Sequence, residues 1–429
     1  MTSGNKLTRW ILIALLLGVV SGMAIHYAVD DVTSIVQHFS LVTTVFLRLI
    51  KMIIAPLVFA TLAVGIAKMG DVSVVGRIGL KAMLWFVGAS LMSLTLGLML
   101  VNLFQPGVAL DIPLPDAGQR SDIVATGLTL AEFVTHLVPA SIVDGMAKNE
   151  ILQIVVFSVF FGVGCAGVGE KAKALVDALE GLSYVMLKVT MLVMWFAPFA
   201  VFAAVASAIA KSGLGVLFTY GKFMAEFYLG IVLLWLLLFV AAWFVLRGRA
   251  FSLFKAVREP TLLAFSTASS EAAYPKTLAL LERFGCSNRI ASFVLPLGYS
   301  FNLDGSMMYC TFATVFIAQA YGIELSLAQQ MTMLLILMVT SKGMAGVPRA
   351  SLVVIAATLA QFNIPEAGLL LLLGIDHFLD MARSATNVIG NSVATAVVSK
   401  WEGQLRTEDQ VAADLENATE PTPPRHGIG

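Results

Sequence analysis

The sequence predicts an all-α integral membrane protein. Of its 429 residues, 58% are hydrophobic and 13% are charged, whereas soluble proteins average roughly 45–50% apolar and about 25% charged residues. Basic and acidic residues both number 27, so the formal net charge is zero and no nucleic-acid partner is expected. The composition thus excludes a disordered chain and an ordinary cytosolic protein.

Apolar runs long enough to cross about 30 Å of hydrocarbon recur along the first part of the chain. The first run has too long an apolar core for a typical signal peptide and is interpreted as a retained helix. The sequence therefore predicts six ordinary spans, at residues 10–29, 39–67, 80–105, 150–168, 182–210 and 224–246.

Loop charges predict the orientation of these spans. Basic residues precede the first span and follow the second and the sixth, whereas the segment between the third and fourth spans is mostly acidic. Because basic loops stay in the cytoplasm, both termini are expected there, in a multi-pass protein of the inner (plasma) membrane. Residues 403–429 are polar and are expected to form a disordered cytoplasmic tail.

Three polar breaks interrupt the apolar pattern after residue 250, at residues 265–275, 302–306 and 341–349. Non-helical backbone at membrane depth must be buried in protein or line a wet cavity, so we expect two re-entrant hairpins and one unwound helix. Freed carbonyls bind cations, and helix N-termini bind carboxylates. The alternative is that Gly, Pro and Ser only allow close helix packing.

The last span, about 367–400, carries Asp376, Asp380, Arg383, Asn387 and Asn391 at helical spacing, which puts them on one face. A charge at the bilayer centre costs ~2.5–3.5 kcal/mol, so these charges need partners. The guanidinium matches a carboxylate, and Asp380 can accept from an ammonium group. An amino acid with an acidic side chain offers both groups. Alternatively, Asp380 and Arg383 only neutralise each other.

Small cations could be bound by hard oxygen ligands that the sequence offers at Asn302, Asp304, Asp376 and Asn391.

Other functional classes are less favoured. The chain has neither an HExxH motif nor a phosphate-cradling glycine loop, so neither an enzyme nor an ATP-driven pump is expected. An anion channel is the other alternative, but a pore needs no paired amino and carboxylate site. We therefore expect a secondary carrier.

Four motifs carry a resemblance to a known family. They are Ser269–Ser270, the Asn-Leu-Asp-Gly-Ser run at 302–306, the Ala-Gly-Val-Pro run at 345–348, and the stripe of the last span. With them the chain resembles the dicarboxylate/amino acid:cation symporters, which include the excitatory glutamate transporters. The resemblance implies eight transmembrane helices, two opposed re-entrant hairpins, inverted repeats, a homotrimer and an elevator motion.

The resemblance also implies a division of the chain and contacts with lipid. Residues 1–250 would form scaffold and trimerisation helices, together with the third and sixth spans of the transport domain. Residues 251–402 would form the core transport domain, with hairpin 1, broken helix 7, hairpin 2 and helix 8. The segment 32–52, with Arg48 and Lys51, is expected to contact lipid headgroups or scaffold partners.

Roles for single residues follow from the same resemblance. Arg383 would bind the substrate side-chain carboxylate and Asp380 its amino group, which favours aspartate or glutamate over succinate or malate. The remaining substrate contacts would come from Ser269, Ser270, Ser306, Val347, Ser384 and Asn387. The extracellular gate would comprise Gly346, Pro348 and Arg349. Sodium sites would draw on Asn302, Asp304, Asp376, Asn391 and Ser90.

Three departures from the family pattern concern the coupling ion. Sodium-coupled members usually have an aspartate at the position of Asn391. They have Thr-Ser at the position of Ala89–Ser90 and a glycine at the position of Arg349. Arg349 could replace a bound cation or be a solvated charge. Sodium and proton coupling both stay open, with Asp304, Asp376 or Glu271 as proton carriers. No cofactor beyond the coupling ion is expected.

Overall fold

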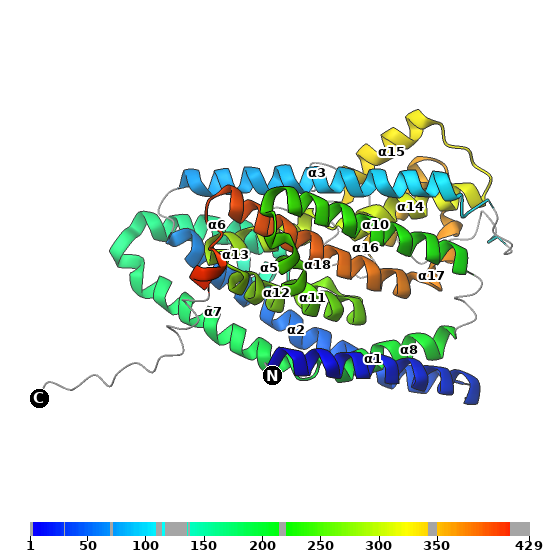
Figure 1. The fold of residues 1–429 in the computed structure, drawn as a ribbon, viewed down its shortest axis with the longest axis horizontal. Helices are drawn as coiled ribbons and strands as arrows, with labels where there is room; N and C mark the ends of the chain where they lie inside the picture. The colour runs from blue at the N-terminus through cyan, green and yellow to red at the C-terminus, as the bar shows by residue number, and fades with distance from the viewer. Residues whose placement is uncertain are drawn as a thin grey trace, which may run out of the picture.

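The computed structural model describes residues 3–29, 31–68, 72–108, 114–115, 135, 138–213, 220–341 and 350–411. This part of the chain is nearly all helical (Figure 1). Its helices are α1 (Ser3–Ala28), α2 (Thr33–Ala67), α3 (Val72–Phe104), α5 (Ile142–Ala147), α6 (Ile151–Val168), η1 (Gly169–Ala172), α7 (Lys173–Met194), α8 (Ala197–Ser212), α10 (Gly221–Leu246), α11 (Arg249–Thr267), α12 (Ser270–Phe284), α13 (Asn288–Phe301), α14 (Asp304–Ala320), α15 (Leu327–Thr340), α16 (Ala350–Gln361), η3 (Glu366–Gly368), α17 (Leu369–Leu373) and α18 (Asp376–Trp401).

Among the described residues, five helical stretches are long and apolar enough to cross a membrane. They are Arg9–Ala28, Thr33–Ala67, Ser73–Phe104, Ile151–Met194 and Gly221–Leu246. The helical membrane character expected from composition is thereby confirmed.

Two expected spans are interrupted in the structure. The span expected at 182–210 divides into α7 and α8, because Pro198 lies in the first turn of α8, where a proline ring is tolerated but does not continue a preceding helix. The last span divides at Gly374–Ile375, so that α18 begins at Asp376. This places the carboxylate of Asp376 in the first turn of α18, next to the positive end of the helix dipole.

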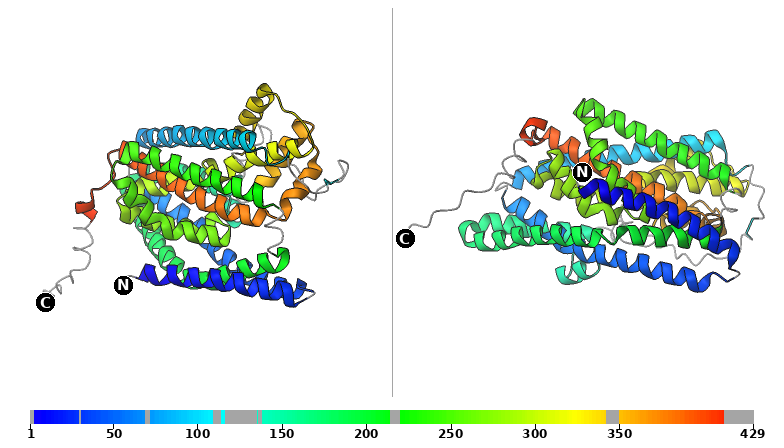
Figure 2. Two further views of the ribbon diagram at one scale, coloured as in Figure 1. Left: turned by 45° about the vertical axis from the view of Figure 1, so that its right-hand side comes forward. Right: turned by 60° about the horizontal axis from the view of Figure 1, so that its bottom comes forward.

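The helices form two groups, visible in Figures 1 and 2. In the peripheral group, α1 lies against α8, and α2 packs on α6, α7 and α8. In the central group, α18 is surrounded by α10, α11, α12, α13 and α14, while α3 packs along α14. The boundary between the groups runs mainly where α12 and α13 meet α2.

The predicted breaks at 265–275 and 302–306 both appear as interruptions between helices. Ala268 adopts the left-handed conformation, and Ser269 caps the following helix, α12, by accepting a hydrogen bond from Ala272 N. Asn302 and Leu303 separate α13 from α14. Most of the third break, residues 342–349, lies outside the described residues.

The end of α18 is fastened to α3 and to the α12–α13 turn. Glu402 accepts from Arg77 at 2.8 Å and from Lys81 at 2.6 Å. Leu405 pairs with Cys286, and Arg406 N donates to Gly285 O at 3.0 Å. Residues 403–411, assigned to the tail from sequence, therefore pack on the helical bundle, and residues 412–429 lie outside the described part.

Glu402→Gln should reduce the free energy of unfolding by about 1–2 kcal/mol, because two cations lose a nearly buried carboxylate. Hydrogen bonding from Arg77 lowers the pKa of Glu402 below its ordinary value of 4.5. A lowered folded-state pKa adds stability above the unfolded-state pKa and loses it as the pH falls through the folded value.

Thermal unfolding in detergent checks this prediction. The difference between wild type and Glu402→Gln should be constant at neutral pH and shrink below pH 4.5. Glu170→Gln, at an exposed position of η1, serves as the control and should unfold like wild type. Equal unfolding of all three proteins at pH 7 would contradict the role given to Glu402.

Candidate substrate and cation site

Arg383 is held in the centre of the bundle between two carboxylates of its own helix. Its Nη2 lies 3.0 Å from Asp376 Oδ1 and 3.0 Å from Asp380 Oδ1. Tyr309 of α14 covers the guanidinium, with its ring centroid 4.1 Å from Cζ, and donates to Asp376 at 3.4 Å. Only 1% of Arg383 is exposed, so its charge is balanced locally rather than by water.

Two further nitrogens of Arg383, Nε and Nη1, are buried without a hydrogen-bond partner among the described residues. Buried donors are costly when unpaired, so they are suited to receive a ligand oxygen. The two carboxylates differ in access: the Asp380 side chain is 37% exposed and that of Asp376 is 5% exposed. Asp380 is therefore the partner that an entering carboxylate can displace.

Asn387, one turn further along α18, fixes the start of α14. Its Oδ1 accepts from Gly305 N at 3.0 Å, and its Nδ2 donates to Ser306 Oγ at 3.3 Å. A Cβ on Gly305 would lie 2.6 Å from Arg383 O, so the two helices approach too closely for a side chain there. Ser384 is also buried beside Arg383. The structure thus brings together the predicted residues of α14 and α18.

The predicted cation ligands form a second cluster at the α13–α14 break. Asn302 Nδ2 donates to Asp304 Oδ2 at 3.1 Å and to Asn391 Oδ1 at 3.2 Å. Asn302 Oδ1 is buried without a hydrogen-bond partner among the described residues, which suits a cation ligand. Ser90 donates to the carbonyl of Phe301 at 3.5 Å.

Sequence reasoning missed Ser93, whose hydroxyl donates to Asp304 Oδ1 at 3.3 Å. The available signal was its spacing, since Ser93 follows Ser90 by three residues and so lies on the same face of α3. It also missed Tyr309, because an aromatic residue within an apolar stretch is expected to be part of the core. Asp376, expected among the cation ligands, accepts hydrogen bonds from Arg383 Nη2 and Tyr309 Oη in the structure.

The turn before α12 presents the Ser269–Ser270 pair. Ser269 Oγ accepts from Ala272 N at 3.3 Å, and the carbonyl of Ser270 accepts from Tyr299 Oη at 3.0 Å. These bonds fix the backbone of the turn, and α11 and α12 pack directly on α18. The predicted gate and substrate residues Gly346, Val347, Pro348 and Arg349 lie outside the described residues.

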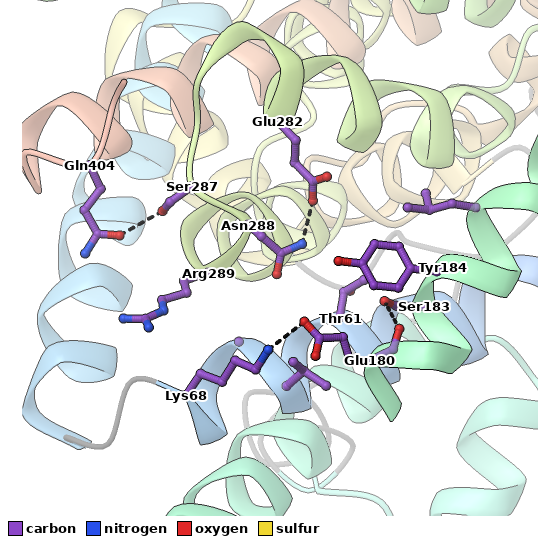
Figure 3. A pocket seen from close by; sticks show the side chains of 13 residues that line it. Thr61, Lys68, Glu180, Ser183, Tyr184, Glu282, Ser287, Asn288, Arg289 and Gln404 are labelled. Carbon is purple, nitrogen blue, oxygen red and sulfur yellow. Dashed lines mark hydrogen bonds and ion pairs between the residues drawn. The ribbon is translucent and has the colours of Figure 1, made fainter. Parts of the chain in front are cut away.

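A cavity of about 450 Å³ opens elsewhere, between α2 and α7 on one side and α12 and α13 on the other (Figure 3). Lys68 and Glu180 pair at 2.6 Å on one wall, and Asn288 donates to Glu282 at 2.6 Å on the other. Neither Arg383 nor Asp304 lines it. This cavity lies at the boundary between the two helix groups and is separate from the arginine site.

Among the described residues, no group of three or more His, Cys, Asp or Glu side chains could hold a metal ion. The oxygen set at the α13–α14 break, made of amide and carboxylate oxygens, is of the kind that binds hard cations. A membrane-embedded bundle with a buried carboxylate-binding arginine beside such a set defines a secondary transporter.

Comparison with known proteins agrees with this class. The family model of the Sodium:dicarboxylate symporter family matches residues 7–401, and the chain belongs to that family. It is 40% identical over 403 residues to a proton/sodium-glutamate symport protein of Geobacillus stearothermophilus, covering 93% of this chain and 95% of the relative. It is also 40% identical over 375 residues to a C4-dicarboxylate transport protein of Bacillus subtilis, covering 86% and 88%.

Gly390→Ala should impair both stability and transport, because a Cβ there would strike the Asp304 carboxylate and approach Asn302 Nδ2 to 3.3 Å. Overpacking of this kind costs about 1–3 kcal/mol. Thermal unfolding and uptake in proteoliposomes measure the two effects. The control is Gly88→Ala in α3, where a Cβ meets no atom within 4 Å. Equal behaviour of the two variants would contradict the close approach of α18 to the α13–α14 break.

Proposed function

We propose that this chain is a secondary symporter of acidic amino acids, aspartate or glutamate, coupled to cations. The observation that carries the proposal is Arg383, held between Asp376 and Asp380 with Nε and Nη1 unpartnered. The name of the Geobacillus stearothermophilus relative supports an amino acid substrate. The Bacillus subtilis relative supports the alternative, a C4-dicarboxylate such as succinate, malate or fumarate.

Substrate selection follows from an exchange of partners. The side-chain carboxylate of the substrate binds the planar guanidinium of Arg383 through two parallel hydrogen bonds and displaces Asp380. The displaced carboxylate then receives the substrate ammonium. The guanidinium and the Asp380 carboxylate both keep a charged partner when the ligand is an acidic amino acid, and its main-chain carboxylate would bind Asn387 and the Ser269–Ser270 turn. A dicarboxylate lacks the ammonium and leaves Asp380 facing a second anion, so it binds less well.

Cation coupling follows from the charge of the site. Asp304, Asp376 and Asp380 together with Arg383 carry a formal charge of minus two, and an acidic amino acid adds one further negative charge. Anions gathered in a low-dielectric interior repel one another strongly. Binding of the substrate therefore requires cations to enter with it, which is the physical basis of symport.

The amide of Asn391 weakens the sodium site at the α13–α14 break. An amide supplies one neutral oxygen, and Asn391 Oδ1 already accepts from Asn302. Fewer anionic ligands lower the affinity for a hard cation. We therefore assign part of the coupling to protons, carried by a carboxylate that becomes neutral when no sodium ion compensates it.

The wider assembly is also part of the proposal. The peripheral group would be the scaffold of a homotrimer in the bacterial inner membrane, with both chain termini in the cytoplasm. The central group would be the part that moves, with α11–α12 and α15–α16 as the two re-entrant hairpins. The cavity at the boundary supports such movement, because walls that are not in close contact slide with less loss of packing than a close-packed seam.

Asp380→Asn should weaken uptake of L-aspartate by about 10–100-fold, since a hydrogen bond to a charged group contributes about 1.5–3 kcal/mol. Succinate should become an effective competitor in this variant. Uptake of labelled aspartate in proteoliposomes measures both effects. Asp177→Asn, the same change at an exposed position of α7, is the control. Strong competition by succinate in wild type, or unchanged selectivity in Asp380→Asn, would overturn the proposed role.

Separate ion gradients test the coupling. In wild type, a proton gradient alone should drive accumulation of L-aspartate, and Asn391→Asp should add a saturable sodium dependence by restoring an anionic ligand. The measurement is uptake at fixed membrane potential with one gradient imposed at a time. Steep sodium dependence in wild type at constant pH, with no response to a proton gradient, would show that the sites tolerate Asn391.

A further inference from the structure

Lys51 is a charged residue of the candidate membrane span Thr33–Ala67, and its partner lies in the other helix group. It stands near the middle of α2, which spans Thr33–Ala67, rather than at the end of the helix where a lysine reaches headgroups easily. Its Nζ lies 3.8 Å from Glu271 Oε2 of α12. A charged side chain within a membrane span has a high free-energy cost, and charged residues that are paired there often mark functional sites.

Glu271 follows Ser270 directly, at the turn that presents the two serines. Its carboxylate lies in the first turn of α12, where the helix dipole favours a negative charge. The backbone of this turn is fixed by the cap at Ser269 and by the hydrogen bond from Tyr299 Oη to Ser270 O. The Ser269–Ser270 turn is therefore expected to move together with Glu271.

Among the ion pairs of the described residues, Lys51–Glu271 is the one that joins the two helix groups. Lys68–Glu180, inside the peripheral group, and Lys81–Glu402, inside the central group, both lie at 2.6 Å. The pair between the groups is at 3.8 Å, with side chains 44% and 24% exposed. Partial hydration and the long distance make this pair weak enough to break and form again.

We propose that the Lys51–Glu271 pair is a latch that holds the serine turn of α12 against α2 in this conformation and opens once in each transport cycle. The inference rests on the proposed movement of the central group against the peripheral group. In this proposal Lys51 and Glu271 are positioning residues that set the rate of movement rather than the affinity, and the coupling proton is carried by Asp304 or Asp376 rather than by Glu271.

The experiment is a double-mutant cycle on the reconstituted full chain, with Lys51→Gln, Glu271→Gln and the double variant. Initial uptake of saturating L-aspartate is measured with proton and sodium gradients both present, and the Kd for aspartate is measured in detergent. Each single change breaks the latch, so each should raise turnover about fivefold. The double variant should be no faster than either single variant, and the Kd should stay within about twofold.

Two controls separate the latch from a local structural effect. Lys51→Arg keeps the charge and should keep the wild-type rate. Arg48→Gln removes a charge from an exposed position one turn away on α2 and should also leave the rate unchanged. Unchanged turnover in both single variants, or independent effects that add in the double variant, would overturn the latch. A wild type that transports succinate but not aspartate would overturn the substrate assignment instead, and the same cycle run with succinate would still test the latch.

Discussion

The arrangement of the central group depends on one constraint, the burial of a guanidinium that cannot lose its proton. Arg383 is 1% exposed, and a charge so far from water requires charged partners in contact with it. Asp376 and Asp380 supply them from the same helix, and Tyr309 adds the face of its ring. The cluster is stable as it stands, yet two guanidinium nitrogens are still unpartnered. Those two nitrogens are where the proposed substrate carboxylate would bind.

Close packing around α18 converts that cluster into a defined site. Gly305 and Gly390 let the α13–α14 break and α18 approach until backbone and carboxylate nearly touch. Trp235 of α10 donates to Thr386 at 2.8 Å, and Tyr228 of α10 donates to Phe378 O at 2.7 Å, so α18 is also held from its other side. Arg383 with its two carboxylates and Asn391 of the proposed cation site thus lie on one helix, and under the proposed function binding at either place changes the electrostatic environment of the other.

The sequence was most informative where the chemistry is local. Helical spacing placed Asp376, Asp380 and Arg383 on one face, and the interruptions at 268–269 and 302–303 occur where small polar residues break the apolar pattern. Residues that act across the fold gave no comparable signal: Ser93 and Tyr309 reach the site only because α3 and α14 pack together and beside α18. The self-neutralising Asp380–Arg383 pair, considered as an alternative to a binding role, is present in the structure, and it is the contact that the proposed exchange would open.

The most direct test of this account is a structure of the reconstituted protein with L-aspartate bound, determined by electron cryomicroscopy. The account predicts that the Arg383 Nη2–Asp380 Oδ1 contact, 3.0 Å here, opens as a ligand carboxylate binds the guanidinium, while the Asp380 carboxylate moves onto the ligand ammonium. An intact Arg383–Asp380 pair with aspartate bound elsewhere would contradict partner exchange as the basis of substrate selection.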